Sequence, residues 1–422
     1  MMGYNEKRLL FLTKYFSRFI VRKIETFHAK GEFILKSIKR FFSQSDWLLL
    51  FLCVACSTMS VTVLISYGMY ETGSWRDAVV QGGASLMGIV AALILSRINY
   101  RLLANVWPVH VVFTWGLVLL TLLKNKSIGP ITFGYAPSGT ENYSWIRFGP
   151  LSLQPTELAK ISFILTFAMH LDNVREKVNQ PVVLGKLLLH LLIPAAIIHI
   201  QGDDGTMLIF LAIGSTMLFS AGISLKYVFS AITAAVCGVA FMLVTGKGLS
   251  GYQVQRVMAL YDSSMATTNP QLYEQTMYQQ DAGRISIGSG QIFGRGLFQP
   301  EHNWVPEGRN DFIFSYMAEG IGFVGCIIVL SVLFSIAFKT LGTALRSKEP
   351  LGAYICAGVF ASLIFQIIVN LGMNLRLLPV IGVTLPFFSS GGSSALMMYL
   401  CMGLVLSVYS HNPKADDMFE QR

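Results

Sequence analysis

The segment Asn303–Gly325, NWVPEGRNDFIFSYMAEGIGFVG, joins a polar, turn-rich stretch directly to an apolar run, with the acid Asp311 at the junction. A carboxylate at such a junction is partly withdrawn from water, which raises its pKa toward the range that suits a general base. Asp is also a preferred N-cap residue, so Asp311 can equally cap the helix that follows. The two interpretations are compatible, and both place Asp311 where a membrane-spanning helix begins.

The composition predicts an all-α, polytopic membrane protein. The chain has 422 residues, of which 53% are hydrophobic and 13% charged, and its mean hydropathy is +0.55. A soluble domain usually carries about 25% charged residues, and several apolar runs here approach or exceed the ~18 residues needed to cross a bilayer. The net charge of +9 lies largely in the first 46 residues and in short loops, so membrane orientation explains it better than nucleic acid does.

We expect about ten transmembrane helices within a membrane domain at 47–410. Their approximate ranges are 47–70, 78–97, 102–123, 156–172, 184–201, 205–221, 226–245, 311–338, 351–372 and 393–410. Basic residues lie in or beside the short connections that share a side with the basic N-terminal segment, so both termini are expected in the cytoplasm. Residues 1–46 are then an amphipathic segment, either on the inner leaflet or as a simple tail, and 411–422 are a second cytoplasmic tail.

The outside of the membrane receives three longer segments, at 124–155, 246–310 and 373–392. The large extracytoplasmic loop at about 246–310 contains Tyr, Trp and Phe among its glycines. Structureless loops of this length are uncommon, so we expect this loop to be ordered.

Polar residues cluster at the outer ends of the spans, beginning with Trp145, Arg147 and the run LSLQPTELAK at Leu151–Lys160. Glu157 and Lys160 are three residues apart, so they share a helical face and can pair at the membrane edge. Charges at membrane depth are functional candidates, and Lys160 is predicted to face a phosphate. A purely structural ion pair is the alternative.

Three further segments carry polar or glycine-rich runs at outer ends. The acids of Gln201–Thr206, QGDDGT, either cap a helix or bind a cation through oxygen. The glycines of Ser286–Gly296, SIGSGQIFGRG, either present backbone N–H groups to an anion or form a tight turn. Within Asn370–Ser394, Arg376 either holds a diphosphate or extends to the surface. His302 stands alone and is expected at the surface.

Together these segments and the opening stretch resemble the SEDS family (shape, elongation, division and sporulation) of bacterial peptidoglycan polymerases, which includes FtsW, RodA and SpoVE. The motifs that carry the resemblance are SWIRFGPLSLQPTELAK, QGDDGT, SIGSGQIFGRGL, PEGRNDFIFSYMAEGIGFVG and NLGMNLRLLPVIGVTLPFFSSGGSS. Their order and spacing match over roughly 47–410, and the last motif slightly favours the RodA-like branch. The departures from the family pattern are Gly202 for Pro, Asp204 for an apolar residue, Arg309 and Asn310 for His-Thr, and Ser390 for Tyr.

The resemblance implies an inverting peptidoglycan glycosyltransferase that polymerises lipid II into β-1,4 glycan strands for cell elongation or division. The family's essential Asp corresponds to Asp311, which would be the catalytic general base, and a single base fits inversion. A diphosphate leaving group calls for basic side chains or a divalent cation, Mg²⁺ or Mn²⁺, and no organic cofactor is expected. The candidate substrate-binding residues are Lys160, Arg147, Trp145, Glu157, Arg376, Glu307 and Ser393, and no metal ligand is predicted among the side chains.

The resemblance also implies partners and a location. A class B penicillin-binding protein is the expected protein partner, and lipid II and undecaprenyl diphosphate-linked glycan are the expected ligands, in the bacterial inner (plasma) membrane and without nucleic acid. A lipid II flippase and a scaffold for the penicillin-binding protein are the alternatives. Polar residues crowd the outer rim rather than lining a route across the membrane, which favours the enzyme over the flippase. Gly320, Gly322, Gly325 and Gly358 would either admit a partner helix or pack within the bundle.

Overall fold

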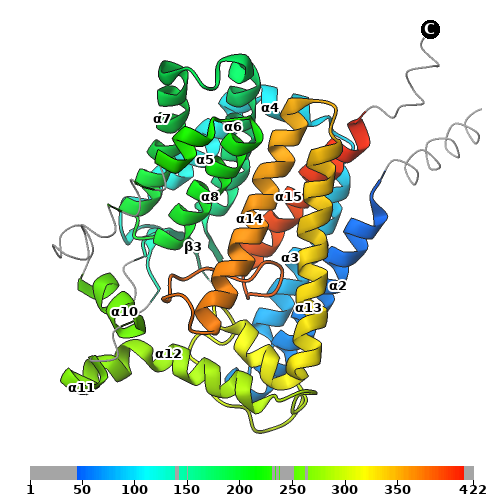
Figure 1. Cartoon of the computed structure of the whole chain (residues 1–422). Coiled ribbons are helices and arrows are strands. Elements are labelled where there is room, and N and C mark those ends of the chain that lie inside the picture. The colour runs from blue at the N-terminus through cyan, green and yellow to red at the C-terminus, as the bar shows by residue number, and fades with distance from the viewer. Residues whose placement is uncertain are drawn as a thin grey trace, which may run out of the picture. The chain divides into compact units, whose positions relative to one another are not determined.

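The computed structural model describes residues 45–137, 142–149, 151–230, 233, 237, 251–261 and 265–412. The chain divides into the units Met1–Trp47 and Leu48–Arg422, and the architecture below is that of the second unit (Figure 1). The predicted cytoplasmic segments 1–46 and 411–422 lie almost wholly outside the described residues.

Helices dominate the described part of the chain. They are α2 (Trp47–Tyr67) with a π-helical turn at Gly68–Thr72, α3 (Arg76–Leu95), α4 (Tyr100–Asn105), α5 (Trp107–Thr121), α6 (Pro155–Val174), α7 (Pro181–Ile200), α8 (Asp204–Ser220), α10 (Gly251–Tyr261), α11 (Met265–Thr268), α12 (Pro270–Ser289), α13 (Ile313–Arg346), α14 (Pro350–Asn374) and α15 (Gly392–His411). Each predicted span within the described residues overlaps a helix, except that 102–123 is divided between α4 and α5. The span 226–245 lies mostly outside the described residues. The count of ten and the orientation of the termini therefore stay predictions.

Six of the described helices are long and apolar enough to cross a membrane, namely α2 with its π-helical turn, α3, α7, α13, α14 and α15. α14 and α15 are the most buried of these, and both are apolar on nearly every face, as helices at the centre of a bundle are. α14 packs against α13 and α8, and α15 packs against α3 (Figure 1). The core is thus built around the two C-terminal helices.

α13 is broken near its start. Gly322 has φ 68° and ψ −173°, so the helix consists of a short piece, Ile313–Ile321, and a long piece from Phe323. The loop after α12 fills the break, because the amides of Phe323 and Val324 donate to the carbonyls of Gln291 and Ile292. A Cβ at Gly322 would lie 2.1 Å from the amide nitrogen of Gly294, so only glycine allows this approach.

The glycines considered as a docking surface for a partner helix mostly face neighbours within the chain. A Cβ at Gly320 would lie 2.4 Å from Leu297, and one at Gly358 would lie 2.8 Å from the sulfur of Met217. With Gly322 packed against the loop, the second interpretation, packing within the bundle, is the one that the structure supports for these three positions.

A four-stranded antiparallel sheet lies between α5 and α6. Its strands β1 (Lys126–Ile128), β2 (Ile131–Tyr135), β3 (Trp145–Phe148) and β4 (Leu151–Leu153) pair in sequence order. The sequence pattern predicted helices only, because strands of three to five residues are too short for their alternation to be recognised. The described part of the large loop is ordered, as expected, and its α12 runs across the end of the bundle (Figure 1).

The close packing of Gly294 against Gly320 and Gly322 leads to a stability prediction. Gly294 has φ +83°, and a Cβ there would lie 2.2 Å from the carbonyl oxygen of Gly320, so Gly294→Ala adds both backbone strain and a clash. We expect it to lower the free energy of unfolding by about 2 to 4 kcal/mol. The measurement is the thermal unfolding midpoint of the purified protein in detergent.

Gly288→Ala is the matched control. Gly288 lies in α12 with open space around its Cβ position, so alanine there should leave the midpoint unchanged or raise it slightly. Equal midpoints for the two variants would contradict the close packing of Gly294 against Gly320.

Candidate active site

Asp311 lies two residues before α13, and its side chain does not cap that helix. Phe312 occupies the N-cap position and makes no side-chain cap, so the capping interpretation of Asp311 is wrong. The side chain is partly buried, and no described residue donates a hydrogen bond to its carboxylate. The acid therefore stands at the start of a span with its oxygen atoms available for chemistry.

Two asparagines of α14 hold the backbone of Asp311. The Nδ2 groups of Asn370 and Asn374 donate to the Asp311 carbonyl oxygen at 2.8 and 3.0 Å. Asn374 Oδ1 in turn accepts from the amide and the hydroxyl of Ser315, at 3.2 and 2.7 Å. Both asparagines are fully buried, so the backbone of Asp311 and the first turn of α13 are both bonded to α14.

The segment that follows α14 runs beside the carboxylate. A Cβ at Gly382 would lie 3.7 Å from Asp311 Oδ2, and a Cβ at Gly205 would lie 2.8 Å from the carbonyl oxygen of Ile381. The start of α8 and the Asp311 carboxylate therefore both lie against the segment that follows α14. Asn370 Nδ2 also donates to the carbonyl of Val383 at 2.8 Å, which fixes that segment against α14.

Asp203 links this region to α6. Its Oδ1 accepts from the amide of Thr206 at 3.1 Å, so the predicted capping role is confirmed for Asp203. Its Oδ2 accepts from Gln154 Nε2 at 2.7 Å, and Gln154 is the residue just before α6. Asp204 instead pairs with His199 at 2.6 Å.

The surroundings make Asp311 a weaker acid than an ordinary aspartic acid. Burial raises the pKa of its carboxyl to about 7, and the negative charges of Glu307 and Asp203 add to the rise. The positive charge of Arg256, in α10, opposes it. Arg256 Nη1 also donates to the carbonyl of Val380 at 2.5 Å, which ties the large loop to the segment beside the acid. A raised pKa is what the position of Asp311 in the sequence predicts.

The predicted Glu157–Lys160 pair is confirmed. Lys160 Nζ lies 2.7 Å from Glu157 Oε1, and both side chains are buried in the first turns of α6. Gln154, which lies just before α6, binds Asp203, and the charge of Asp203 acts on Asp311. The first turn of α6 therefore links the Glu157–Lys160 pair to the surroundings of Asp311. A contact between Lys160 and a phosphate stays a prediction.

Arg376 and Glu307 are both held by neighbours. Arg376 has φ +60°, its Nη1 lies 2.7 Å from Asp281 Oδ1, and its Nη2 donates to the hydroxyl of Tyr273. The side chain thus binds α12 rather than extending into solvent. A contact between Arg376 and a diphosphate stays a prediction. Glu307 accepts from Asn310 Nδ2 at 2.6 Å and acts on Asp311 through its charge.

The other predicted substrate-binding residues lie at the sheet and at α15. Arg147 is exposed on β3, where its Nε donates to the carbonyl of Gly149 at 3.0 Å and its guanidinium lies over the ring of Tyr135. Trp145 is half-buried on the same strand, and Ser393 is buried in the first turn of α15. None of these three is among the groups whose charge shifts the pKa of Asp311.

Glu319 is a further residue of this region that was not among the predicted site residues. It is fully buried in the short piece of α13, where it accepts from Ser286 Oγ at 2.8 Å and from Arg295 Nη1 at 3.2 Å. It also accepts from the amide and the side chain of Asn303, each at 3.1 Å. These bonds close the stretch from 303 to 319, which carries Asp311 in its middle. A lone acid inside an apolar run was the signal that could have identified it.

His302 is buried rather than at the surface, so that expectation is wrong. Its Nε2 donates to the carbonyl of Leu297 at 3.1 Å, and its ring packs 4.7 Å from the ring of Tyr316. The hydrogen bonds between Asn303 and Glu319 account for this burial, because they hold the adjacent His302 inside the domain.

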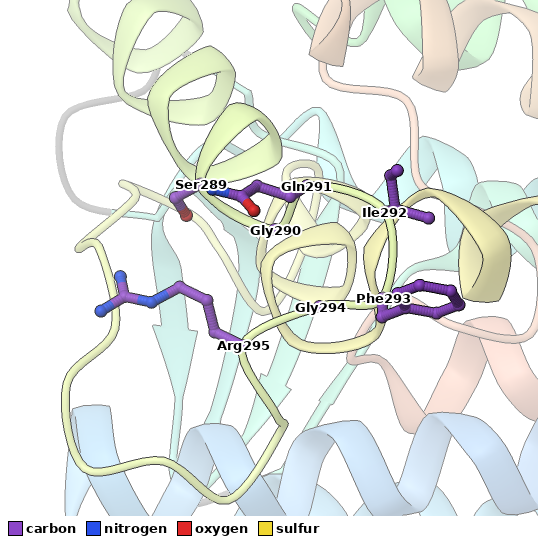
Figure 2. Close-up of a pocket in the computed structure, with 7 residues that line it drawn as sticks. All are labelled: Ser289, Gly290, Gln291, Ile292, Phe293, Gly294 and Arg295. Atoms are coloured by element: carbon purple, nitrogen blue, oxygen red, sulfur yellow. The ribbon is translucent and has the colours of Figure 1, made fainter.

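The glycine-rich loop Ser289–Arg295 lines an open pocket, in which Arg295 points away from Ile292 and Phe293 (Figure 2). The predicted use of its amides for an anion is not supported. The amides of Gly290, Gly294, Arg295 and Gly296 all donate to carbonyls of the chain, so they are occupied. The pocket contains none of the residues around Asp311.

The described residues do not fit a metal centre held by the protein. Within the described ranges, no group of three or more His, Cys, Asp or Glu side chains is placed to bind an ion. The divalent cation stays a prediction.

Comparisons with known proteins agree with these observations. A sequence model of the FtsW/RodA/SpoVE family, described as cell cycle proteins, matches residues 43–414. The "Probable peptidoglycan glycosyltransferase FtsW" of Geobacter metallireducens is 29% identical over 384 residues, covering 89% of this chain and 96% of the relative. The "Peptidoglycan glycosyltransferase MrdB" of Escherichia coli K12 is 28% identical over 372 residues, covering 87% and 94%.

A solved structure shares the fold. It is described as "Structural coordination of polymerization and crosslinking by a peptidoglycan synthase complex", and one of its chains matches with a TM-score of 0.69 at 24% identity. The match covers 87% of this chain and 99% of that chain. Relatives named FtsW and MrdB match this chain almost equally, so the slight preference for the RodA-like branch stays a prediction.

The asparagine anchors generate a second stability prediction. Asn374→Ala removes the acceptor of the buried Ser315 hydroxyl and one of the two donors to the Asp311 carbonyl. We expect a loss of about 1 to 3 kcal/mol in the free energy of unfolding. The thermal midpoint in detergent measures it.

Gln366→Ala provides the comparison. Gln366 is buried two turns earlier on α14 and donates to Ser362 Oγ of its own helix, so its removal frees no group of α13. A midpoint for Asn374→Ala no lower than that of Gln366→Ala would contradict the anchoring role.

Proposed function

Because the chain belongs to the FtsW/RodA/SpoVE family of cell cycle proteins, we propose that it is a peptidoglycan glycosyltransferase. The family model spans nearly the whole chain, and relatives of similar length carry this name. The substrate of the proposed reaction is lipid II, and the product is a β-1,4 glycan strand that remains attached to undecaprenyl diphosphate.

The observation that carries the proposal is the Asp311 carboxyl, free of hydrogen bonds from described residues and with a pKa raised to about 7. A base with this pKa is about half ionised near neutral pH and still takes up a proton readily. The 4-hydroxyl of an N-acetylglucosamine gives its proton to Asp311 as its oxygen forms the bond to the anomeric carbon of the donor. The bond from that carbon to the diphosphate breaks, and the electron pair leaves with undecaprenyl diphosphate. Attack opposite the leaving group inverts the configuration.

Positive charge near the leaving group stabilises the transition state, because the diphosphate gains negative charge as the bond breaks. Lys160 remains the first candidate, since it lies at the outer end of α6 and is linked through Gln154 and Asp203 to the region of Asp311. Arg256 is a second candidate for stabilising the leaving group, because its positive charge acts on Asp311. A Mg²⁺ or Mn²⁺ ion that arrives with the diphosphate is part of the same proposal.

The setting of the proposed reaction follows from the same family membership. We place the multi-pass chain in the bacterial inner (plasma) membrane, with a class B penicillin-binding protein as partner. The matched synthase complex couples polymerisation to crosslinking, which supports such a pairing. A flippase or a scaffold would not require a general base at Asp311.

The first test is polymerisation of fluorescent lipid II by the purified chain with a class B penicillin-binding protein. Asp311→Ala should lower the rate by at least about 10²-fold, because it removes the base. The products are followed as a ladder on a gel, with and without magnesium or manganese.

Asp204→Asn is the control, since Asp204 pairs with His199 and lies outside the proposed machinery. It should give a normal ladder. A ladder from Asp311→Ala as strong as that of the control would remove Asp311 from catalysis. An intact complex without any ladder would favour the flippase or the scaffold.

The pKa of Asp311 predicts the pH dependence of the rate. The base acts in its ionised form, so the rate should fall as the pH drops through about 7. Glu307→Gln removes a negative charge that raises this pKa, and the acid limb should therefore move to lower pH. Initial polymerisation rates on both sides of neutrality measure the limb. An unchanged limb in Glu307→Gln would contradict the electrostatic assignment.

A further inference from the structure

The sheet β1–β4 separates polar from apolar side chains into two rows. Residues paired across strands share a face, and neighbours along a strand point to opposite faces. The polar row consists of Ser127, Thr132, Arg147 and Ser152, which pair in turn across the four strands. The apolar row consists of Ile128, Ile131, Phe148 and Leu151, which pair in the same way.

The apolar row is largely uncovered by the described residues. Ile146, on the same face, is fully buried against the rest of the domain. Farther out, Ile128, Phe148 and Leu151 are 61%, 41% and 58% exposed. Single exposed apolar residues are ordinary, but here three of them, with the partly buried Ile131 between Ile128 and Phe148, share one row on one face of a sheet.

The position of the sheet sets what can cover this row. Only residues 122–125 separate α5 from β1, and a single residue separates β4 from α6. The amide of Asn125 donates to the carbonyl of Gly134, which holds β2 against the end of α5. The amide of Tyr143 donates to the carbonyl of Gln201 at the end of the membrane-spanning α7. The sheet is thereby fixed at the level where the apolar helices end.

The surrounding residue types are those of a membrane surface. Lys124 lies over the ring of Tyr143 and Arg147 over the ring of Tyr135, with Trp145 beside them on β3. Tyr and Trp are enriched where acyl chains meet headgroups, and basic side chains complement anionic lipid. Among the described residues of 122–153, the charged ones are all basic.

We propose that this sheet is a lipid-facing wedge, with the apolar row inserted among the acyl chains of the adjacent leaflet. The polar row, which includes Arg147, then lies at the headgroups. The sheet leads directly into α6, so the insertion fixes the depth of Gln154 and of the Glu157–Lys160 pair relative to the bilayer.

The proposal is tested by quenching of fluorescent labels on the chain. Each chain is held singly in a lipid nanodisc. The labels are placed on Ile128→Cys and Leu151→Cys in the apolar row, with Ser127→Cys and Ser152→Cys as controls one residue away. Cys237→Ser serves as the background, because the other described cysteines are buried. A normal thermal midpoint and elution volume show that each labelled chain is folded.

The expected result is an alternation along each strand. Nitroxide groups on lipid acyl chains should quench labels at 128 and 151 several-fold more than labels at 127 and 152, and aqueous iodide should show the reverse. Equal access of iodide to all four labels would overturn the proposal. Protection of 128 and 151 from both quenchers would also overturn it, because protein would then cover the row.

Discussion

The carbonyl oxygen of Asp311 accepts hydrogen bonds from two buried amides of α14, and the arrangement of this end of the bundle depends on these bonds. A backbone that enters a span must have its polar groups bonded, since hydrocarbon offers no substitute. Asn370 and Asn374 meet this need at the point where the loop becomes α13. The bonds of Glu319 to Asn303 close the same stretch from its other side, and the break at Gly322 lets the loop after α12 pack into the helix. The acid is thus held by its backbone, which leaves its side chain free.

Two acids near one another show how surroundings set their roles. Asp203 is buried, and burial raises its pKa, but its carboxylate accepts hydrogen bonds that oppose the rise and cap α8. Asp311 lacks such donors among the described residues, and the charges of Glu307 and Asp203 raise its pKa further. An acid that is bonded on its oxygen atoms serves structure, whereas one left without donors can exchange a proton near neutral pH. This contrast supports Asp311 as the base of a glycosyl transfer and assigns Asp203 to the scaffold around it.

Much of this arrangement is predictable from the sequence. Apolar runs located the helices, and spacing alone paired Glu157 with Lys160, because both signals are local. The features that were missed depend on contacts between distant segments. Asn370 and Asn374 are ordinary amides in an apolar run until α13 packs beside them, and His302 is drawn inside only when Glu319 closes its loop. The glycine-rich loop was compatible with an anion site, but its amides are taken by carbonyls of α13 and of its own turn. Asp311 does not cap the helix because α13 begins at Ile313, so Phe312 occupies the N-cap position.

The central claim is that Asp311 carries a proton that it can exchange near neutral pH. Infrared difference spectra between the wild type and Asp311→Asn, recorded in lipid across a pH series, would show the carboxyl stretch of this one side chain as it titrates. The account predicts a midpoint of about 7. A midpoint near the ordinary value of 3.8 would mean that water reaches the carboxylate freely, and Asp311 would then not be the base described here.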